Sequence, residues 1–585
     1  MLFAPKDCFA TSDRNNPQPH NMKFIDYAFF AALCWGIGIN ALQAQNEGDI
    51  TPESIDIVKP YEPILGDAAR VELSPDLPSL DDLAKEKPVF NDYYITPKFL
   101  TIKYTPVELK PIGYDDSNKK KKGDDGEKCR YVWLRGGYGN LKTPLADIAL
   151  STCRTKKWIA GLNASYIGSQ GPIEFQDYNR LGGRAFGKIY TNQYYVGIDA
   201  GYQRNTYYQY GFTHADTSLQ FTADELRRRY ETISARATLG NSAENDQVID
   251  YTAALNYQTM GDNRNSREHY IDLQGDIGGL LNENWAWGVQ LRDEFSSLNR
   301  PDSNTYSNNL LQASPTVTYK ANFGNFTAGA TAILDGGKFY PFPKIALEVF
   351  VLPKSLTLYG GWNKEGGKNT YQSLANQNPF IEQSTELRNS IRQNRYLGIK
   401  GALGKILSYN AKGFYNVVKN QALFVNVGTP LDIDNGISRL MTTVYDPRMS
   451  EIGASLEIAA RLTDIATISL ATTYTSRNTD TETEAWHLPT LLSNLRADIQ
   501  PIKKLQLTVD AYLINGMKAR ITNDTPDNSY TIPTAFDLNV AARFDIIDNI
   551  GVFVTANNLL AQKYDRFFYY PVYGLNIVGG ITCRF

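Results

Sequence analysis

The sequence has few of the residues that build metal sites and disulfide scaffolds. Its 585 residues include 5 Cys and 4 His, too few for a disulfide-stapled domain or a histidine-rich metal centre. The net charge is −3, so the chain lacks the basic excess that binding to nucleic acid requires. Mean hydropathy is −0.37, which excludes a bundle of membrane-spanning helices. We therefore expect no nucleic-acid partner, no cofactor and no resident metal.

Tyrosine and glycine are abundant instead. The chain holds 37 Tyr and 45 Gly, a combination that favours many strands and turns in a hydrophilic protein. No G-x-S-x-G, H-E-x-x-H, P-loop or Rossmann fingerprint occurs, and these motifs would be the usual signs of catalysis or nucleotide binding. The sequence therefore gives no reason to expect an enzyme.

One apolar stretch, residues 24–42, lies near the N-terminus. Its most apolar part is residues 28–39, too short to span a membrane comfortably and right for the central region of a signal peptide. Cleavage is predicted after Ala44, with residues 1–44 removed; residues 1–21 are a poor signal-peptide start, so Met22 is the expected initiator and 1–21 a miscalled extension. A retained signal anchor is the alternative. The rest of the chain is then exported.

Two regions follow. Residues 45–128 are irregular and rich in proline, and they end in a charged linker at 115–128. From residue 129 to residue 585 the sequence pattern is uniform. We interpret 45–128 as a periplasmic or small plug-like segment and 129–585 as one domain.

The long region alternates apolar and polar residues with period 2, which indicates strands. In residues 194–202 every second residue, from Tyr194 to Tyr202, is apolar, and the residues between them form the opposite face. A soluble β-sandwich also fits alternation, but two details favour a membrane barrel. The apolar faces often end in aromatic residues, as an interfacial girdle requires, and the opposite faces carry charge in mid-strand, which suits a wet lumen: Asp199, Arg236, Asp510 and Arg543. A propeller is the main rival, but no shared repeat of about 40–50 residues is visible.

Segments of this kind number 22. The connections between them alternate in length, short after the even segments and long after most odd ones, as in outer-membrane barrels with short periplasmic turns and long extracellular loops. The fold predicted is therefore all-β: a transmembrane antiparallel barrel of about 22 strands, preceded by a short irregular segment. Both of its ends lie on the periplasmic side. The expected location is the outer membrane of a Gram-negative-type bacterium.

The C-terminal residues 555–585 resemble the last two strands of TonB-dependent receptors. The matching residues are Asn558, Leu559, Lys563, Tyr564, Pro571, Gly574 and the terminal Phe585. A terminal aromatic residue is also the export signature that outer-membrane barrels share. The resemblance implies a 22-strand barrel and, as partners, outer-membrane lipid, the outer-membrane insertion machinery and TonB.

The chain departs from that family in its N-terminal part. Only the 84 residues of 45–128 are available for a plug, fewer than a full plug domain has, and residues 55–58 resemble a TonB box only faintly. Three functions therefore stay open. The barrel gates the passage of a solute, or it is a large passive porin, or it is an occluded structural barrel that binds other envelope proteins. Gated passage is the first hypothesis; the substrate-binding residues are unknown.

A few side chains could carry chemistry or covalent links. The first hairpin centres near residue 141, so positions that sum to about 282 face each other, and Cys129 and Cys153 meet this condition. They form a disulfide at the periplasmic rim or stay two free thiols; Cys583 faces lipid. The three histidines His214, His269 and His487 lie in or beside loops without ligand spacing. Asp480, Glu482 and Glu484 form an acidic loop that either binds a hard cation or is simply solvated.

Overall fold

The computed structural model describes residues 132–152, 158–191, 193–212, 221–241, 249–301, 305–352, 355–382, 387–404, 406–427, 440–463, 465–520 and 529–585. The predicted signal peptide, the segment 45–128, Cys129, Cys153 and His214 lie outside these ranges. Within them, no helix is long and apolar enough to cross a membrane.

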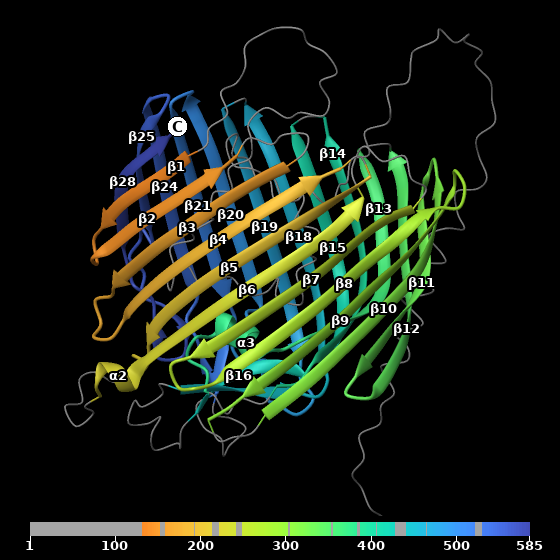
Figure 1. Ribbon diagram of the computed structural model, residues 1–585, viewed down its shortest axis with the longest axis horizontal. Coiled ribbons are helices and arrows are strands. Elements are labelled where there is room, and N and C mark those ends of the chain that lie inside the picture. The colour runs from red at the N-terminus through yellow and green to blue at the C-terminus, as the bar shows by residue number, and fades with distance from the viewer. Residues whose placement is uncertain are drawn as a thin grey trace, which may run out of the picture. The chain divides into compact units, whose positions relative to one another are not determined.

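The described chain forms one antiparallel sheet of 22 strands that closes on itself (Figure 1). This confirms the predicted fold and its strand count. The strands of the barrel are β1 (Val132–Gly139), β2 (Thr143–Ser151), β3 (Trp158–Gln170), β4 (Asp177–Tyr190), β5 (Tyr194–Tyr208), β6 (Arg227–Asn241), β7 (Ile249–Asp262), β8 (Arg267–Leu280), β9 (Trp285–Asn299), β10 (Thr305–Ala321), β11 (Gly324–Asp335), β12 (Lys338–Leu352), β13 (Leu356–Gly367), β14 (Ser390–Leu403), β15 (Leu407–Lys419), β18 (Met449–Thr463), β19 (Ala466–Asn478), β20 (Leu491–Ile502), β21 (Leu505–Asn515), β24 (Ala535–Ile547), β25 (Ile550–Asn557) and β28 (Asn576–Arg584).

The barrel closes where its first strand meets its last. β1 pairs with β28 from Trp133 opposite Arg584 to Gly139 opposite Val578. Beyond this ladder, Val132 and Phe585 exchange two backbone hydrogen bonds of 3.0 and 2.9 Å. The start of β1 and the end of β28 therefore lie at one end of the barrel, as Figure 1 shows with the C-terminus beside β28 and β25.

Side chains alternate between the two faces of the sheet as the sequence pattern predicts. On β5, Ile198 is 63% exposed on the outer face, whereas the neighbouring Asp199 faces inward and accepts a hydrogen bond of 2.9 Å from Arg184 Nε. Large apolar side chains stay exposed on the outside of most strands. An exposed apolar surface of that extent fits contact with lipid and would be unfavourable in water.

The two ends of the barrel differ. The end that holds Phe585 has short connections, such as residues 548–549 between β24 and β25; we call it the short-turn end. The long connections lie at the opposite end, the loop end, and carry further elements: α2 (Ala223–Leu226), α3 (Tyr371–Gln377), β16 (Gln421–Val427), β17 (Leu440–Asp446), β22 (Lys518–Arg520), β23 (Ser529–Thr531), β26 (Asp565–Phe567) and β27 (Tyr570–Pro571). The alternation of short and long connections is thus confirmed.

Several strands extend further toward the loop end than the sequence predicts. β4, β10 and β12 begin at Asp177, Thr305 and Lys338, whereas alternation begins at residues 184, 312 and 342. In the stretches 177–183 and 305–309 polar residues lie on both faces. Period-2 contrast fades there because neither face is strongly apolar, although the backbone ladder continues.

Candidate functional site: a cap of loops across the loop end

The inner wall of the barrel is lined by charged residues in ion pairs. Arg292 Nε and Nη2 lie 3.0 Å from the two carboxylate oxygens of Asp272 on the adjacent strand. The same guanidinium lies 3.3 Å from Glu294. Asp199 and Arg543 also face inward, as expected for a polar lumen. Arg543 forms an ion pair of 2.9 Å with Asp545. A wall of this kind favours water and polar solutes over an apolar filling.

Loops from around the rim join in one apolar cluster at the loop end. The cluster contains inward side chains of strands on opposite arcs of the barrel, among them Tyr207, Tyr230 and Ile514, together with residues of the loops. A contiguous cluster with members on both arcs requires that the loops cross the mouth between them. We call these packed loops the cap.

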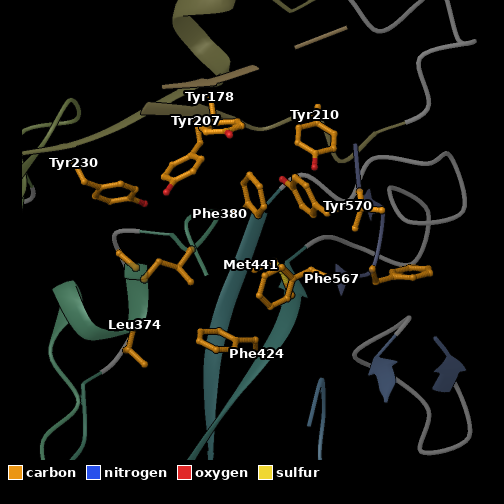
Figure 2. Close-up of a cluster of buried hydrophobic side chains, with 14 of the residues drawn as sticks. Tyr178, Tyr207, Tyr210, Tyr230, Leu374, Phe380, Phe424, Met441, Phe567 and Tyr570 are labelled. Carbon is orange, nitrogen blue, oxygen red and sulfur yellow. The ribbon is translucent and has the colours of Figure 1, made fainter. Parts of the chain in front are cut away.

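Aromatic rings form the centre of the cap (Figure 2). Phe380, which follows α3, stacks on Tyr570 of β27 with ring centroids 3.6 Å apart and an interplanar angle of 11°. Tyr210, which follows β5, meets Tyr570 edge to face at 5.0 Å. Phe567 of β26 contacts Phe424 of β16 at 6.1 Å. Four loops that are remote in sequence thus share one aromatic core, and such contacts add to the gain from burial.

Hydrogen bonds fix α3 to the barrel wall. The buried carboxylate of Glu268, on β8, accepts hydrogen bonds from the backbone N–H groups of Tyr371 and Gln372 at 2.9 and 2.8 Å. These are the first N–H groups of α3, which have no partner within the helix. Arg228 Nη2 donates to the carbonyl of Ile381 at 2.6 Å, and the Tyr230 hydroxyl donates to the carbonyl of Pro379 at 2.8 Å. The segment is therefore held from β6 and β8.

A second set of hydrogen bonds holds the hairpin of β26 and β27. The carbonyl of Pro571 accepts from the Tyr210 hydroxyl at 3.0 Å and from Gln176 Nε2 at 2.8 Å. The Tyr564 hydroxyl donates to the Asp537 carboxylate at 2.9 Å. The hairpin is thus attached both to the loops after β3 and β5 and to the wall strand β24.

His487 is buried where three loops meet. Its Nδ1 lies 2.9 Å from the carbonyl of Phe424 on β16, and the backbone N–H of Phe568 donates to its Nε2 at 3.3 Å. The ring is therefore neutral, with the proton on Nδ1. Burial lowers the pKa of His487 to about 4, and the positive charge of the nearby Arg566 also lowers it. The hydrogen bond to the Phe424 carbonyl acts in the opposite direction and raises the pKa. The sequence analysis placed this histidine in a loop and gave it no role; its position between loops was not predicted.

The acidic loop is tied into the cap by cations and amides. Glu482 accepts from Trp486 Nε1 at 2.7 Å and lies 3.4 Å from Arg520, and Glu484 pairs with Lys518. The backbone N–H groups of residues 480–482 all point at the buried carboxylate of Asp446. In the described part of the chain no group of three or more His, Cys, Asp or Glu side chains is arranged to hold a metal ion.

The other residues singled out in the sequence lie apart from the cap. His269 faces outward on β8, with Nδ1 3.0 Å from the Tyr257 hydroxyl. Cys583 is an outward-facing free cysteine on β28, and Phe585 is half exposed at the short-turn end. The hairpin of β1 and β2 has the expected register, since Val132 faces Leu150 and Gly139 faces Thr143; a disulfide between Cys129 and Cys153 falls outside the described residues.

The motif residues of the C-terminal segment shape the connection between β25 and β28. Asn558 adopts a positive φ of 48° and closes a turn, because its side-chain oxygen accepts from Gln562 N at 3.0 Å and its Nδ2 donates to Gln562 O at 2.8 Å. Gly574 also has a positive φ, of 72°, where a residue with a Cβ would be strained. Here the signal that could have revealed the cap is visible: residues 567–573 are an aromatic run inside a long loop.

The chain was compared with known proteins. No protein-family model matches it, and no curated protein does. Solved structures do match. The iron transporter FrpB from Neisseria meningitidis aligns with a TM-score of 0.60 at 10% identity, over 79% of this chain and 82% of that one. The siderophore receptor PiuA from Acinetobacter baumannii aligns with a TM-score of 0.57 at 10% identity, over 78% and 82%.

A third structure is similar to the same extent. The ferripyoverdine receptor of the outer membrane of Pseudomonas aeruginosa, bound to ferripyoverdine, aligns with a TM-score of 0.55 at 14% identity, over 78% of this chain and 72% of that one. All three are named as transporters or receptors. Identities this low carry only the fold. The chain thus has the 22-strand barrel fold of TonB-dependent outer-membrane receptors.

Proposed function

We propose that this protein gates the passage of a solute across the outer membrane of a Gram-negative-type bacterium, with the loop end facing outward. Two observations support the proposal. The barrel shares its fold with an iron transporter and with siderophore receptors, and its inner wall carries paired charges suited to a polar path. Ferric chelates are the first class of solute to test, because they are what the similar proteins are named for.

The cap is the single observation that carries gating rather than open diffusion. A passive porin needs an unobstructed mouth, whereas here an aromatic core joins loops across it. Passage then requires the cap to rearrange, and the free energy for that comes from solute binding or from an energised partner such as TonB. Residues 45–128 are the proposed second obstacle, as a small plug on the periplasmic side. Insertion into the membrane is proposed to use the outer-membrane insertion machinery.

Planar-bilayer conductance of the purified full chain tests gating. The cap can be shortened without disturbing the wall, because Val418 and Met449 face each other at the end of the ladder between β15 and β18. A short Gly-rich turn can therefore replace residues 420–447, which removes Phe424 and its contacts. Four proteins are compared: the wild type, this cap variant, a variant that lacks residues 45–128, and the combination.

We expect the wild type to conduct little and the combined variant to form large, stable channels. Uptake of a ferric chelate by cells, and its loss in a strain without TonB, is the companion measurement. Large, stable conductance of the wild type would overturn gating and point to a passive porin. Silence of all four proteins, each shown to be folded by heat-modifiable gel migration, would instead point to an occluded structural barrel.

A further inference from the structure

The wall of the barrel is split between β12 and β13 at the loop end. β12 pairs with β11 from Lys338 to Val349. Its pairing with β13 begins only at Ile345, opposite Trp362, and runs toward the short-turn end. Residues 363–367 of β13 pair with β14 alone. The loop ends of β10, β11 and β12 therefore belong to one sheet, and those of β13, β14 and β15 belong to another.

These two sheets overlap instead of meeting edge to edge. On β14, Leu397 is 51% exposed on the outer face, and Ile391 shares that face because every second residue of a strand faces the same side. Ile391 is nevertheless only 4% exposed, because it packs against Leu310 and Ile333. Leu310 lies on the inner face of β10, opposite Glu294. The end of β14 therefore lies on the lumen side of β10 and β11.

We call this overlap the lapped joint. Its outer layer comprises residues 308–312 and 333–342, and its inner layer comprises residues 362–368, 389–391 and 419. Gln312 Oε1 accepts a hydrogen bond from the N–H of Gly366 at 2.9 Å, and Lys368 Nζ donates to the carbonyl of Asn308 at 2.8 Å. The Asn389 amide donates to Asn308 Oδ1 at 2.8 Å. Because the ladder of β12 and β13 stops short of the lapped joint, side chains hold the two layers together.

Aromatic rings and ammonium groups fill the rest of the lapped joint. Phe342, on the inner face of β12, meets Trp362 edge to face with ring centroids 5.2 Å apart, and Lys364 Nζ lies 4.5 Å from the Phe342 ring. Lys419 Nζ lies 4.6 Å from the ring of Tyr340. Attraction between a cation and a ring extends to about 6 Å from the centroid, whereas a backbone hydrogen bond holds only over about 2.7–3.2 Å. The two layers can therefore shift along each other without losing these contacts at once.

The sequence of β12 prevents the two layers from joining in a ladder. The N–H of Phe350 donates to the carbonyl of Phe323 on the β11 side at 2.7 Å. Successive N–H groups of a strand point to opposite sides, so the nitrogens of the odd-numbered residues in this continuous register point toward the β13 side. Two of those residues, Pro341 and Pro343, have no N–H to donate. The split in the wall is therefore encoded in the sequence of β12.

The inner layer of the lapped joint continues directly into the cap. β13 ends at Gly367, the chain then forms α3, and β14 begins at Ser390. Between α3 and β14 lies Phe380, whose ring stacks on Tyr570 at the centre of the cap. A movement of the ends of β13 and β14 therefore moves α3 and Phe380 with them.

We propose that the lapped joint is a sliding joint that opens the cap. The ends of β13, β14 and β15 slide along the inner face of β10, β11 and β12, and α3 and Phe380 leave the aromatic core. Separating a complete ladder would leave backbone groups without partners, at a high cost in a membrane, whereas sliding here exchanges side-chain contacts. Small sliding movements between packed elements are a common form of conformational change. The inference rests on the proposed gating and deepens it, because it names the part of the wall that moves.

A disulfide across the lapped joint tests the proposal. In L310C/G366C the new side chains meet, because a Cβ at position 366 would lie 3.1 Å from Leu310 Cδ2. The matched control is T318C/T327C, which links β10 to β11 at a pair of the ladder whose hydroxyl oxygens lie 2.9 Å apart. The full chain, with its native cysteines replaced by serine, is measured oxidised and reduced. Heat-modifiable migration checks that each barrel is folded, and thiol labelling checks that each disulfide has formed.

Hydrogen exchange of residues 371–377 is the readout, because α3 is attached to β6 and β8, away from the new disulfide. We expect exchange in oxidised L310C/G366C to be roughly tenfold slower than in its reduced form, since the main opening movement of α3 is then blocked. Oxidation of T318C/T327C should leave the exchange unchanged. Equal exchange in the oxidised and reduced forms of folded L310C/G366C would overturn the proposal, and so would equal slowing in the control.

A variant with the opposite effect needs no disulfide. Gly366→Leu inserts a side chain between the two layers and should speed the exchange of residues 371–377. Gly275→Leu is its control, because a Cβ at that position would meet nothing within 4 Å. Unchanged exchange in folded Gly366→Leu would contradict the sliding joint. Conductance decides gating separately: wild type that conducts freely would reject the proposed function, while the exchange of residues 371–377 still decides whether the lapped joint controls α3.

Discussion

The ring of His487 accepts a hydrogen bond from the backbone N–H of Phe568 at 3.3 Å. The two residues are 81 positions apart in the sequence and belong to different loops of the cap. The contact exists only while Nε2 is unprotonated, because a protonated ring has no acceptor.

This contact makes the cap sensitive to acid. The pKa of His487 is lowered to about 4 by burial, whereas an exposed histidine titrates near 6.5. Between these values the opened cap binds more protons than the closed one, so the cap is at full stability above about pH 6.5 and loses it progressively as the pH falls toward 4. The total loss is about 3 kcal/mol. Hydrogen exchange of residues 421–426 and 565–571 across this range measures it.

Two variants separate this residue from general acid effects. His487→Gln does not titrate, so the protection factors of its cap, which are exchange rates relative to the intrinsic rate at each pH, should be nearly independent of pH between 4 and 6.5. His269→Gln removes a histidine on the outer face and should keep the wild-type profile. A profile that persists in His487→Gln would assign the sensitivity to other groups.

Glu268 should be the main attachment of α3. Replacing it with alanine removes the acceptor of two buried N–H groups, those of Tyr371 and Gln372. We expect faster hydrogen exchange in residues 371–377, corresponding to a loss of about 1–3 kcal/mol. Glu231→Ala is the control, since its ion pair with Arg229 is exposed and such pairs contribute little. Equal exchange in both variants would show that the aromatic core alone holds α3.

The prolines of β12 should keep barrels apart. P341T/P343T places two new N–H donors on an edge that has no partner strand. We expect the double variant to form dimers or larger assemblies through this edge, since free edges template pairing. Cross-linking and size-exclusion chromatography in detergent measure the shift. Substitution of Pro315, a proline on β10 that pairs with Val289 and whose strand has a partner strand on both sides, serves as the control and should leave the barrel monomeric.

The disulfide between Cys129 and Cys153 stays a prediction. The ladder of β1 and β2 pairs residues that sum to 282, and extending it by three residues brings these two cysteines opposite each other. After cleavage at Ala44 the chain would hold three cysteines. Alkylation of the unfolded, unreduced protein should then label Cys583 alone, and reduction should expose the other two. Labelling of all three cysteines before reduction would show that Cys129 and Cys153 are free thiols.

The strands could be predicted and the cap could not, for a physical reason. A wall with lipid on one side and water on the other imposes a contrast between adjacent residues, so Ile198 and Asp199 reveal the two faces locally. The contact between Phe380 and Tyr570 joins positions 190 residues apart. The local sequence of either loop does not indicate which other loop it contacts. The aromatic run at 567–573 indicates an apolar loop, but the place where this loop packs depends on three other loops.

At the loop end, residues 338–344 of β12 and 363–367 of β13 do not pair with each other. This loss of pairing was hidden in the sequence for a related reason. Pro341 and Pro343 lie beside and within a segment of alternating apolar and polar residues. The sequence does not indicate on which side such a strand lacks a hydrogen-bonded partner strand. Trp362, Arg395 and Tyr415 lie on three different strands, β13, β14 and β15, and only the register brings them into one row. Register between hairpins is fixed by the closed sheet as a whole and by no single segment.

Closure through β1 and β28 also sets the order of events during biogenesis. The ladder between these strands is packed by glycines, and a Cβ on Gly580 would come within 2.0 Å of the carbonyl oxygen of Gly136. The two strands are separated by the rest of the barrel domain, so neither finds its partner until synthesis has reached Phe585. A chain that stops early keeps two open edges and has no sealed wall. Sealing of the wall therefore waits for the last strand, β28, and cannot precede it.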